Sequence, residues 1–128
     1  MSKRILAIED DRFLSSLIKA RLEKEGLEVI QAFDGEEALV WLKQNKPDLI
    51  VLDLIMPKVS GFDFLEKISV DPDLSRVPVM ILSNLGQESD IEKVKRLGAV
   101  KYFVKINTSI DDMVNNVKEL LEESGKSE

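Results

Sequence analysis

The sequence contains no cysteine and no histidine among its 128 residues. Without cysteine the chain cannot form disulfide bonds, and no thiolate is present to act as a nucleophile or metal ligand. Without histidine there is no imidazole to serve as a base, a nucleophile or a metal ligand. Any chemistry in this chain therefore falls to carboxylates, hydroxyls and amines.

Long apolar runs and an excess of positive charge are also missing. No stretch approaches the roughly 20 apolar residues that span a bilayer. The apolar stretch near the N-terminus is too short for a secretion signal, because it ends at the acidic residue Glu9. We therefore expect a cytoplasmic protein with no membrane contact. The net charge of −6 argues against direct nucleic-acid binding, which draws its affinity from cationic groups.

Short apolar runs alternate with stretches of helical periodicity, and this alternation predicts a parallel α/β fold. Three of the runs are nearly continuous in apolar residues, as expected for strands that are covered by helices on both faces. The second run contains Glu28 and Gln31 and suits an edge strand. The predicted strands are residues 5–8, 28–32, 49–52, 77–82 and 100–104.

Five stretches carry apolar residues at helical spacing. The first is expected to end near Gly26 and to bury one face made of Phe13, Leu14, Leu17, Ile18 and Leu22. The next three span about residues 36–44, 62–68 and 91–97. The last follows Thr108 and Asp111, which are spaced as a partial capping box. Right-handed crossovers between five such βα units predict a doubly wound sheet.

Polar side chains follow four of the predicted strands at their carboxyl ends, which is the edge where open α/β sheets bind ligands. Glu9 and Asp10 follow the first strand and Asp53 follows the third. If these two strands are neighbours, the three carboxylates form one acidic cleft. The hydroxyl of Ser83 and the amine of Lys105 end the fourth and fifth strands.

Carboxylates that are packed together repel, so the cleft needs a cation or raised pKa values. Oxygen ligands without histidine or cysteine favour magnesium, which accepts one or two carboxylates together with water. The lysine and the hydroxyl on the same edge supply donors for the oxygens of a phosphoryl group. The set therefore predicts phosphoryl transfer to a carboxylate with magnesium as cofactor.

Four segments, taken in order, closely resemble the response regulator receiver family. They are residues 4–11 (RILAIEDD), 48–57 (DLIVLDLIMP) with Gly61, 79–83 (VMILS) and 98–105 (GAVKYFVK). The resemblance implies a flavodoxin-like (βα)5 three-layer sandwich with parallel strand order 2-1-3-4-5. It also implies a single receiver domain over residues 1–128, with its core at about residues 3–121 and no room for an output domain.

The same resemblance implies roles for the residues of the cleft. Asp53 is expected to accept a phosphoryl group from the phosphohistidine of a sensor histidine kinase or a phosphotransfer protein. Magnesium is expected to be held by Asp10, Asp53 and the backbone carbonyl of Ile55, with Glu9 acting through a water molecule.

Lys105 and Ser83 are expected to contact the phosphoryl oxygens. Ser83 and Tyr102 are expected to form the switch, with Tyr102 turning inward when Ser83 moves, so that a downstream effector protein is signalled. The chain is then a signalling domain and not an enzyme, apart from its own phosphoryl transfer and slow autodephosphorylation. It is expected to be a monomer or a dimer that forms on phosphorylation.

Two positions near the cleft depart from the family pattern. Ile106 stands where the family usually has a proline joined to the lysine by a cis peptide bond. Because a cis bond to a non-proline residue costs about 2.5–4 kcal/mol, we expect Lys105-Ile106 to be trans. Asn84 stands where a small residue is usual, which narrows access to Ser83.

Two further departures concern dephosphorylation. Ile55 and Leu85 each lie two residues beyond a site residue, at positions where polar side chains of the family help to place the hydrolytic water. Apolar side chains there shield an acyl phosphate, so we expect slow autodephosphorylation.

Three other functions compete with that of a receiver. An aspartyl phosphatase needs a second acid two residues after its nucleophile, where Ile55 stands. A flavin carrier needs a phosphate-binding loop after the first strand, whereas residues 9–11 are acidic and repel phosphate. A phosphorylation-independent scaffold is disfavoured by the complete set of site residues, although Ile106 keeps it open. Two residues also have a purely structural interpretation. Asp11 is suited to cap the first helix, and Tyr102 is suited to fill space in the core.

Overall fold

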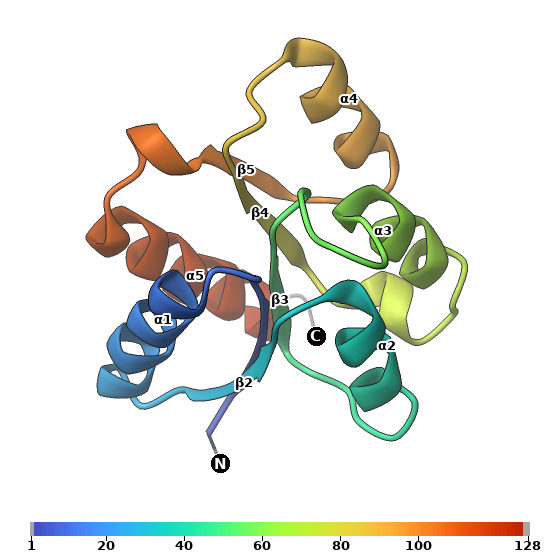
Figure 1. Cartoon of the computed structure of the whole chain (residues 1–128). Coiled ribbons are helices and arrows are strands. Elements are labelled where there is room, and N and C mark those ends of the chain that lie inside the picture. Colours follow the sequence, from blue (N-terminus) through green and yellow to red (C-terminus); the bar gives the residue numbers. More distant parts are fainter. Residues whose placement is uncertain (1, 127–128) are drawn as a thin grey trace.

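The computed structural model describes residues 2–126 and contains a parallel sheet between two layers of helices (Figure 1). The strands lie in the order β2-β1-β3-β4-β5. Helices α1 and α5 cover one face, and α2, α3 and α4 cover the other. The elements are β1 (Arg4–Ile8), α1 (Arg12–Lys24), β2 (Glu28–Ala32), α2 (Gly35–Leu42), β3 (Leu49–Leu52), α3 (Gly61–Ser69), η1 (Leu74–Arg76), β4 (Val79–Ser83), α4 (Glu88–Arg96), β5 (Lys101–Val104), η2 (Lys105–Asn107) and α5 (Ile110–Lys126).

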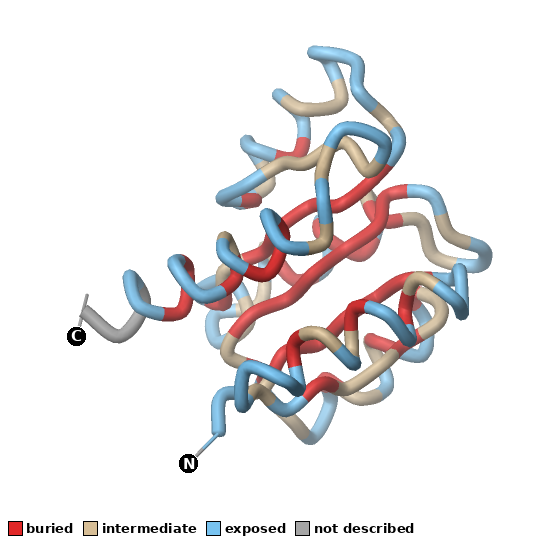
Figure 2. Tube along the Cα trace, turned by 90° about the vertical axis from the view of Figure 1, so that its left-hand side faces the viewer, coloured by how far each residue is buried: buried red, intermediate tan, exposed pale blue. Residues whose placement is uncertain are grey.

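The central strands supply two cores at once, because successive side chains of a strand point to opposite faces of the sheet. Leu6, Ile8, Ile50 and Leu52 pack beneath α2, α3 and α4. The residues between them, Ile5, Ala7, Leu49 and Val51, pack beneath α1 and α5. The buried strands run through the middle of the molecule in Figure 2. This double burial explains why β1 and β3 are continuous in apolar residues, and the predicted fold and strand order are confirmed.

The helices expose a polar face and bury an apolar one. In α5, the longest helix with 17 residues, Met113, Val114 and Val117 are buried while Lys118 and Glu119 are exposed. Within residues 2–126, no helix combines the length and the apolar character needed to cross a membrane.

Side-chain caps and glycines set the helix ends. Asp11 accepts a hydrogen bond from the Leu14 amide at 3.1 Å, and Asp34 accepts one from Glu37 at 2.8 Å. These acceptors satisfy amides that have no partner inside the helix. Gly26, with φ of 85°, and Gly98, with φ of 104°, adopt the left-handed conformation just beyond α1 and α4. The capping role of Asp11 and the stop predicted at Gly26 are therefore confirmed, and Gly98 ends α4 in the same way.

The predicted face of the first helix is partly wrong. Phe13 is 83% exposed and Leu17 is 38% exposed, while Ser15 is fully buried. The buried stripe follows Ser15, Ile18 and Leu22, and the Gln31 amide donates to the Ser15 hydroxyl at 3.0 Å. Helical spacing alone showed the stripe but not this polar contact with β2.

Two predicted element starts are also wrong. The hydroxyl that caps α5 belongs to Ser109, which accepts from the Asp112 amide at 3.1 Å, while Thr108 donates to the Val104 carbonyl. The fourth strand starts at Val79 and not at Val77, because η1 and Pro78 precede it. Neither η1 nor η2 was predicted.

We predict that Phe64→Ala lowers the free energy of unfolding by about 3–5 kcal/mol, because the ring is fully buried under α3 and its removal leaves a cavity. Phe13→Ala is the matched control, since that ring is 83% exposed and little buried area is lost. Urea unfolding measures both. A loss below about 1 kcal/mol for Phe64→Ala would contradict the packing described.

Candidate functional site: an acidic pocket at the carboxyl edge of the sheet

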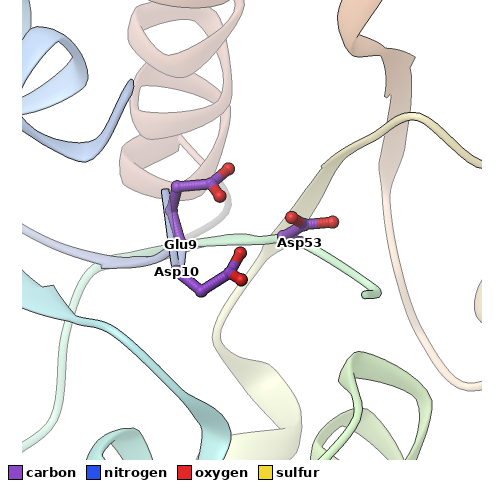
Figure 3. Close-up of side chains that lie close together, drawn as sticks. All are labelled: Glu9, Asp10 and Asp53. Carbon is purple, nitrogen blue, oxygen red and sulfur yellow. The ribbon is translucent and has the colours of Figure 1, made fainter. Parts of the chain in front are cut away.

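Glu9, Asp10 and Asp53 meet at the carboxyl ends of β1 and β3. The two strands pair in parallel with Ile8 opposite Leu52, so the residues that follow them are neighbours. The Asp53 amide extends the pairing by donating to the Ile8 carbonyl at 3.1 Å. Ligand oxygens of the three carboxylates lie within 4.8 Å of one another, around the same small space (Figure 3). The acidic cleft predicted from the sequence is present.

Lys105 joins the two buried carboxylates of this pocket. Its Nζ lies 2.6 Å from Oε1 of Glu9 and 2.8 Å from Oδ2 of Asp53. Glu9 and Asp53 are only 2% and 5% exposed, whereas Asp10 is exposed. The lysine follows Val104, which pairs with Ser83 of β4, so the end of β5 brings it to the same edge of the sheet.

The pocket carries more negative than positive charge, because three carboxylates share one ammonium group. Burial raises the pKa of Glu9 to about 7, although hydrogen bonds from Lys105 and from the Asp11 amide oppose this and the Asp53 charge adds to it. Burial by itself would lower the pKa of Lys105, but the hydrogen bonds to Asp53 and Glu9 outweigh it and raise that pKa. A further cation would relieve the excess charge.

The backbone on both sides of Asp53 is tightly fitted. The Ile55 amide donates to Oδ1 of Asp53 at 3.1 Å, and the Ile55 side chain is 56% exposed. A Cβ on Gly61 would lie 2.5 Å from the Asp53 carbonyl oxygen, so only glycine fits there. The role of the Ile55 carbonyl as a metal ligand stays a prediction.

Ser83 and Tyr102 are connected through a third residue, Leu85. Ser83 is fully buried at the end of β4, and its Oγ accepts a hydrogen bond from the Leu85 amide at 3.4 Å. The Tyr102 hydroxyl donates to the Leu85 carbonyl, and burial, with the charges of Asp90 and Asp53, raises the Tyr102 pKa. Sequence reasoning missed this connection, because it depends on the backbone of Leu85 and not on its side chain.

Lys105 also begins the short helix η2, at the departure from the family pattern. No peptide bond is cis in the described part of the chain, so the predicted trans bond between Lys105 and Ile106 is confirmed. Ile106 is 85% exposed and leaves the ammonium of Lys105 free to reach inward. Proline is therefore not required to hold the lysine against Asp53.

Comparison with known proteins points to one family. The model of the response regulator receiver domain matches residues 5–121. The phosphate regulon transcriptional regulatory protein PhoB of Rhizobium meliloti is 35% identical over 94% of this chain and 53% of its own length. Protein PilH of Pseudomonas aeruginosa is 34% identical over 80% of this chain and 84% of its own.

A solved structure agrees with this result. The response regulator receiver domain protein (CheY-like) of Methanospirillum hungatei superposes with a TM-score of 0.91, at 26% identity and with full coverage of both chains. This chain spans about half the length of PhoB, since the match takes in 53% of that protein. The shared strand order, the acidic pocket and the match over most of the chain lead to one conclusion: this chain belongs to the response regulator receiver domain family of two-component systems.

Proposed function

We propose that Asp53 accepts a phosphoryl group from the phosphohistidine of a sensor histidine kinase or a phosphotransfer protein. The observation that carries this proposal is the contact between Asp53 Oδ2 and Lys105 Nζ at 2.8 Å, within a pocket shared with Glu9 and Asp10. Asp53 is the nucleophile because it lies at the centre of the pocket, bonded to the lysine on one oxygen and to the Ile55 amide on the other.

We propose that the pocket binds magnesium. The donor set fits this ion, because the three clustered side chains offer only carboxylate oxygens and one of them, Asp10, is exposed to solvent. Asp10, Asp53 and the Ile55 carbonyl would bind directly, and Glu9 through water. When bound, the ion would supply charge neutralisation for the incoming phosphoryl oxygens.

The transfer itself is a displacement at phosphorus. An Asp53 oxygen forms the new P–O bond while the P–N bond to the donor imidazole breaks, and the imidazole leaves with that electron pair and takes up a proton. Lys105 already lies against Asp53 and is protonated, so its ammonium group is placed to pair with a phosphoryl oxygen. Ser83, at the end of the neighbouring strand, would donate its hydroxyl to another.

The output follows from the contacts of Leu85. If Ser83 turns its hydroxyl toward the phosphoryl group, the loop after β4 changes its contact with Ser83, and Tyr102 shares that loop through the Leu85 carbonyl. We propose that an effector protein recognises the loop after β4 once it has moved. One receiver domain with its core at about residues 3–121 suffices for these steps. The cytoplasmic location and the monomer or phosphorylation-dependent dimer stay predictions.

We predict that acetyl phosphate with magnesium adds one phosphoryl group to the protein, and that Asp53→Asn abolishes the addition. Intact mass spectrometry measures both. Asp48→Asn is the matched control, since Asp48 lies before β3 at the opposite end and bonds to the Arg4 amide at 2.7 Å. An unmodified wild-type mass would instead support a phosphorylation-independent scaffold.

We predict that the phosphorylated protein decays slowly, because Ile55 and Leu85 supply no polar group to place a hydrolytic water. Ile55→Asn should speed the decay, as measured by loss of the added mass over time. Val40→Asn is a matched control, because Val40 is also an exposed apolar residue but lies on α2. Loss of the wild-type phosphoryl group within seconds would contradict the prediction.

We predict that, with metal ions chelated, stability falls as the pH rises from 4.5 to about 7. The folded protein holds the Glu9 proton over this range while the unfolded chain releases it, so the free energy of unfolding falls, by about 1.4 kcal/mol for each unit of pKa difference. Glu9→Gln should lack this component. Urea unfolding across the pH range compares the two proteins, and parallel curves would be the contrary result.

A further inference from the structure

The loop between β3 and α3 rests against the first turn of α2. A Cβ on Gly35 would lie 2.7 Å from the carbonyl oxygen of Val59 and 2.8 Å from its Cβ. No real side chain tolerates such distances, so either the loop or α2 would have to move. The contact therefore depends on the absence of a side chain at Gly35, which lies 24 residues before Val59.

The far end of this loop cannot absorb such a movement. The Gly61 amide donates to the Leu54 carbonyl at 3.0 Å, and Ser60 caps α3 by accepting from Asp63 at 3.1 Å. Gly61 itself fits against the carbonyl of Asp53 with no space for a Cβ. A shift of Val59 is therefore more easily taken up on its other side, within residues 55–58.

Residues 55–58 are the part of the loop that lies next to Asp53. Ile55 donates its amide to the Asp53 carboxylate at 3.1 Å. Lys58 has a φ of 67°, the left-handed conformation that is costly for a residue with a side chain. Its side chain reaches toward α2: Lys58 Nζ lies 3.6 Å from Oδ2 of Asp34, the residue that caps α2 through its other oxygen.

We propose that Gly35 is a positioning residue for the metal and phosphoryl site. The first turn of α2 fixes the position of Val59. Val59 in turn fixes the backbone conformation of residues 55–58, including the Ile55 backbone beside Asp53. Any partner or substitution that displaces the start of α2 then also shifts the backbone of residues 55–58 beside Asp53. This inference rests on the proposed magnesium and phosphoryl site, and it adds α2 to the elements that control that site.

The test is Gly35→Ala, with magnesium affinity measured by isothermal titration calorimetry. We expect binding to weaken about tenfold, as is common when the residues that orient metal ligands are disturbed. In the metal-free protein, the amide resonance of Ile55 should also shift in a ¹⁵N–¹H spectrum. That second readout reports the loop directly and needs no bound ion.

Gly26→Ala is the matched control. Gly26 has a φ of 85° and open space around its Cβ position, so alanine there strains the backbone but touches nothing. It should lower stability while leaving both the magnesium affinity and the Ile55 resonance unchanged. If a folded Gly35→Ala protein behaves in the same way, the positioning role is refuted.

A second variant serves if Gly35→Ala does not fold. Asp34→Ser keeps a capping oxygen for α2 but removes the partner of Lys58. Because the pair is partly exposed, we expect only about twofold weaker magnesium binding, together with a shift of the Ile55 resonance. An unchanged resonance would overturn the proposal. Wild-type protein that neither binds magnesium nor takes up a phosphoryl group would overturn the proposed function itself, whatever the Ile55 resonance shows.

Discussion

The ammonium group of Lys105 makes this pocket possible. Glu9 and Asp53 are both buried at the end of adjacent strands, and two such carboxylates would repel without a cation between them. Removing one partner from a buried ion pair costs about 3–5 kcal/mol, because the charge that remains has neither water nor a counter-ion. In the parallel sheet, the end of β5 lies at the same edge as the ends of β1 and β3, so Lys105 is close to both carboxylates.

Phosphorylation of Asp53, as proposed, would change the partners of Lys105. Lys105 divides its hydrogen bonds between Glu9 and Asp53, and a phosphoryl group on Asp53 would offer it stronger acceptors. Among the described residues 2–126, the neighbouring hydroxyl of Ser83 has only the Leu85 amide as its partner, at a long 3.4 Å. In the proposed switch this weak bond would be exchanged for one to a phosphoryl oxygen, and a change of charge at Asp53 would then move the loop to which Tyr102 is also bonded.

The fold and the acidic cluster were predictable from the sequence because both follow from strand-end chemistry. Apolar runs mark strands that are buried on two faces, and Glu9 and Asp53 stand directly after them. The exposure of Phe13 was not predictable, since helical spacing does not show which edge of the apolar stripe faces the sheet, and the contact of Ser15 with Gln31 joins two separate elements. The roles assigned to Ile55, Ser83 and Tyr102 came from resemblance and remain predictions.

Backbone contacts explain why the rest of the site was out of reach of sequence reasoning. Tyr102 and Ser83 meet at the amide and carbonyl of Leu85, groups that any residue there would supply. Likewise Gly35 meets the carbonyl of Val59, and neither residue carries a functional group that would mark it. The polar side chains at this edge of the sheet can be recognised in the sequence. The loops that carry them are positioned by contacts between backbone atoms, which the sequence does not reveal. We therefore expect that a substitution far from Asp53 in sequence, such as one at Gly35, alters the pocket without changing any of its polar side chains.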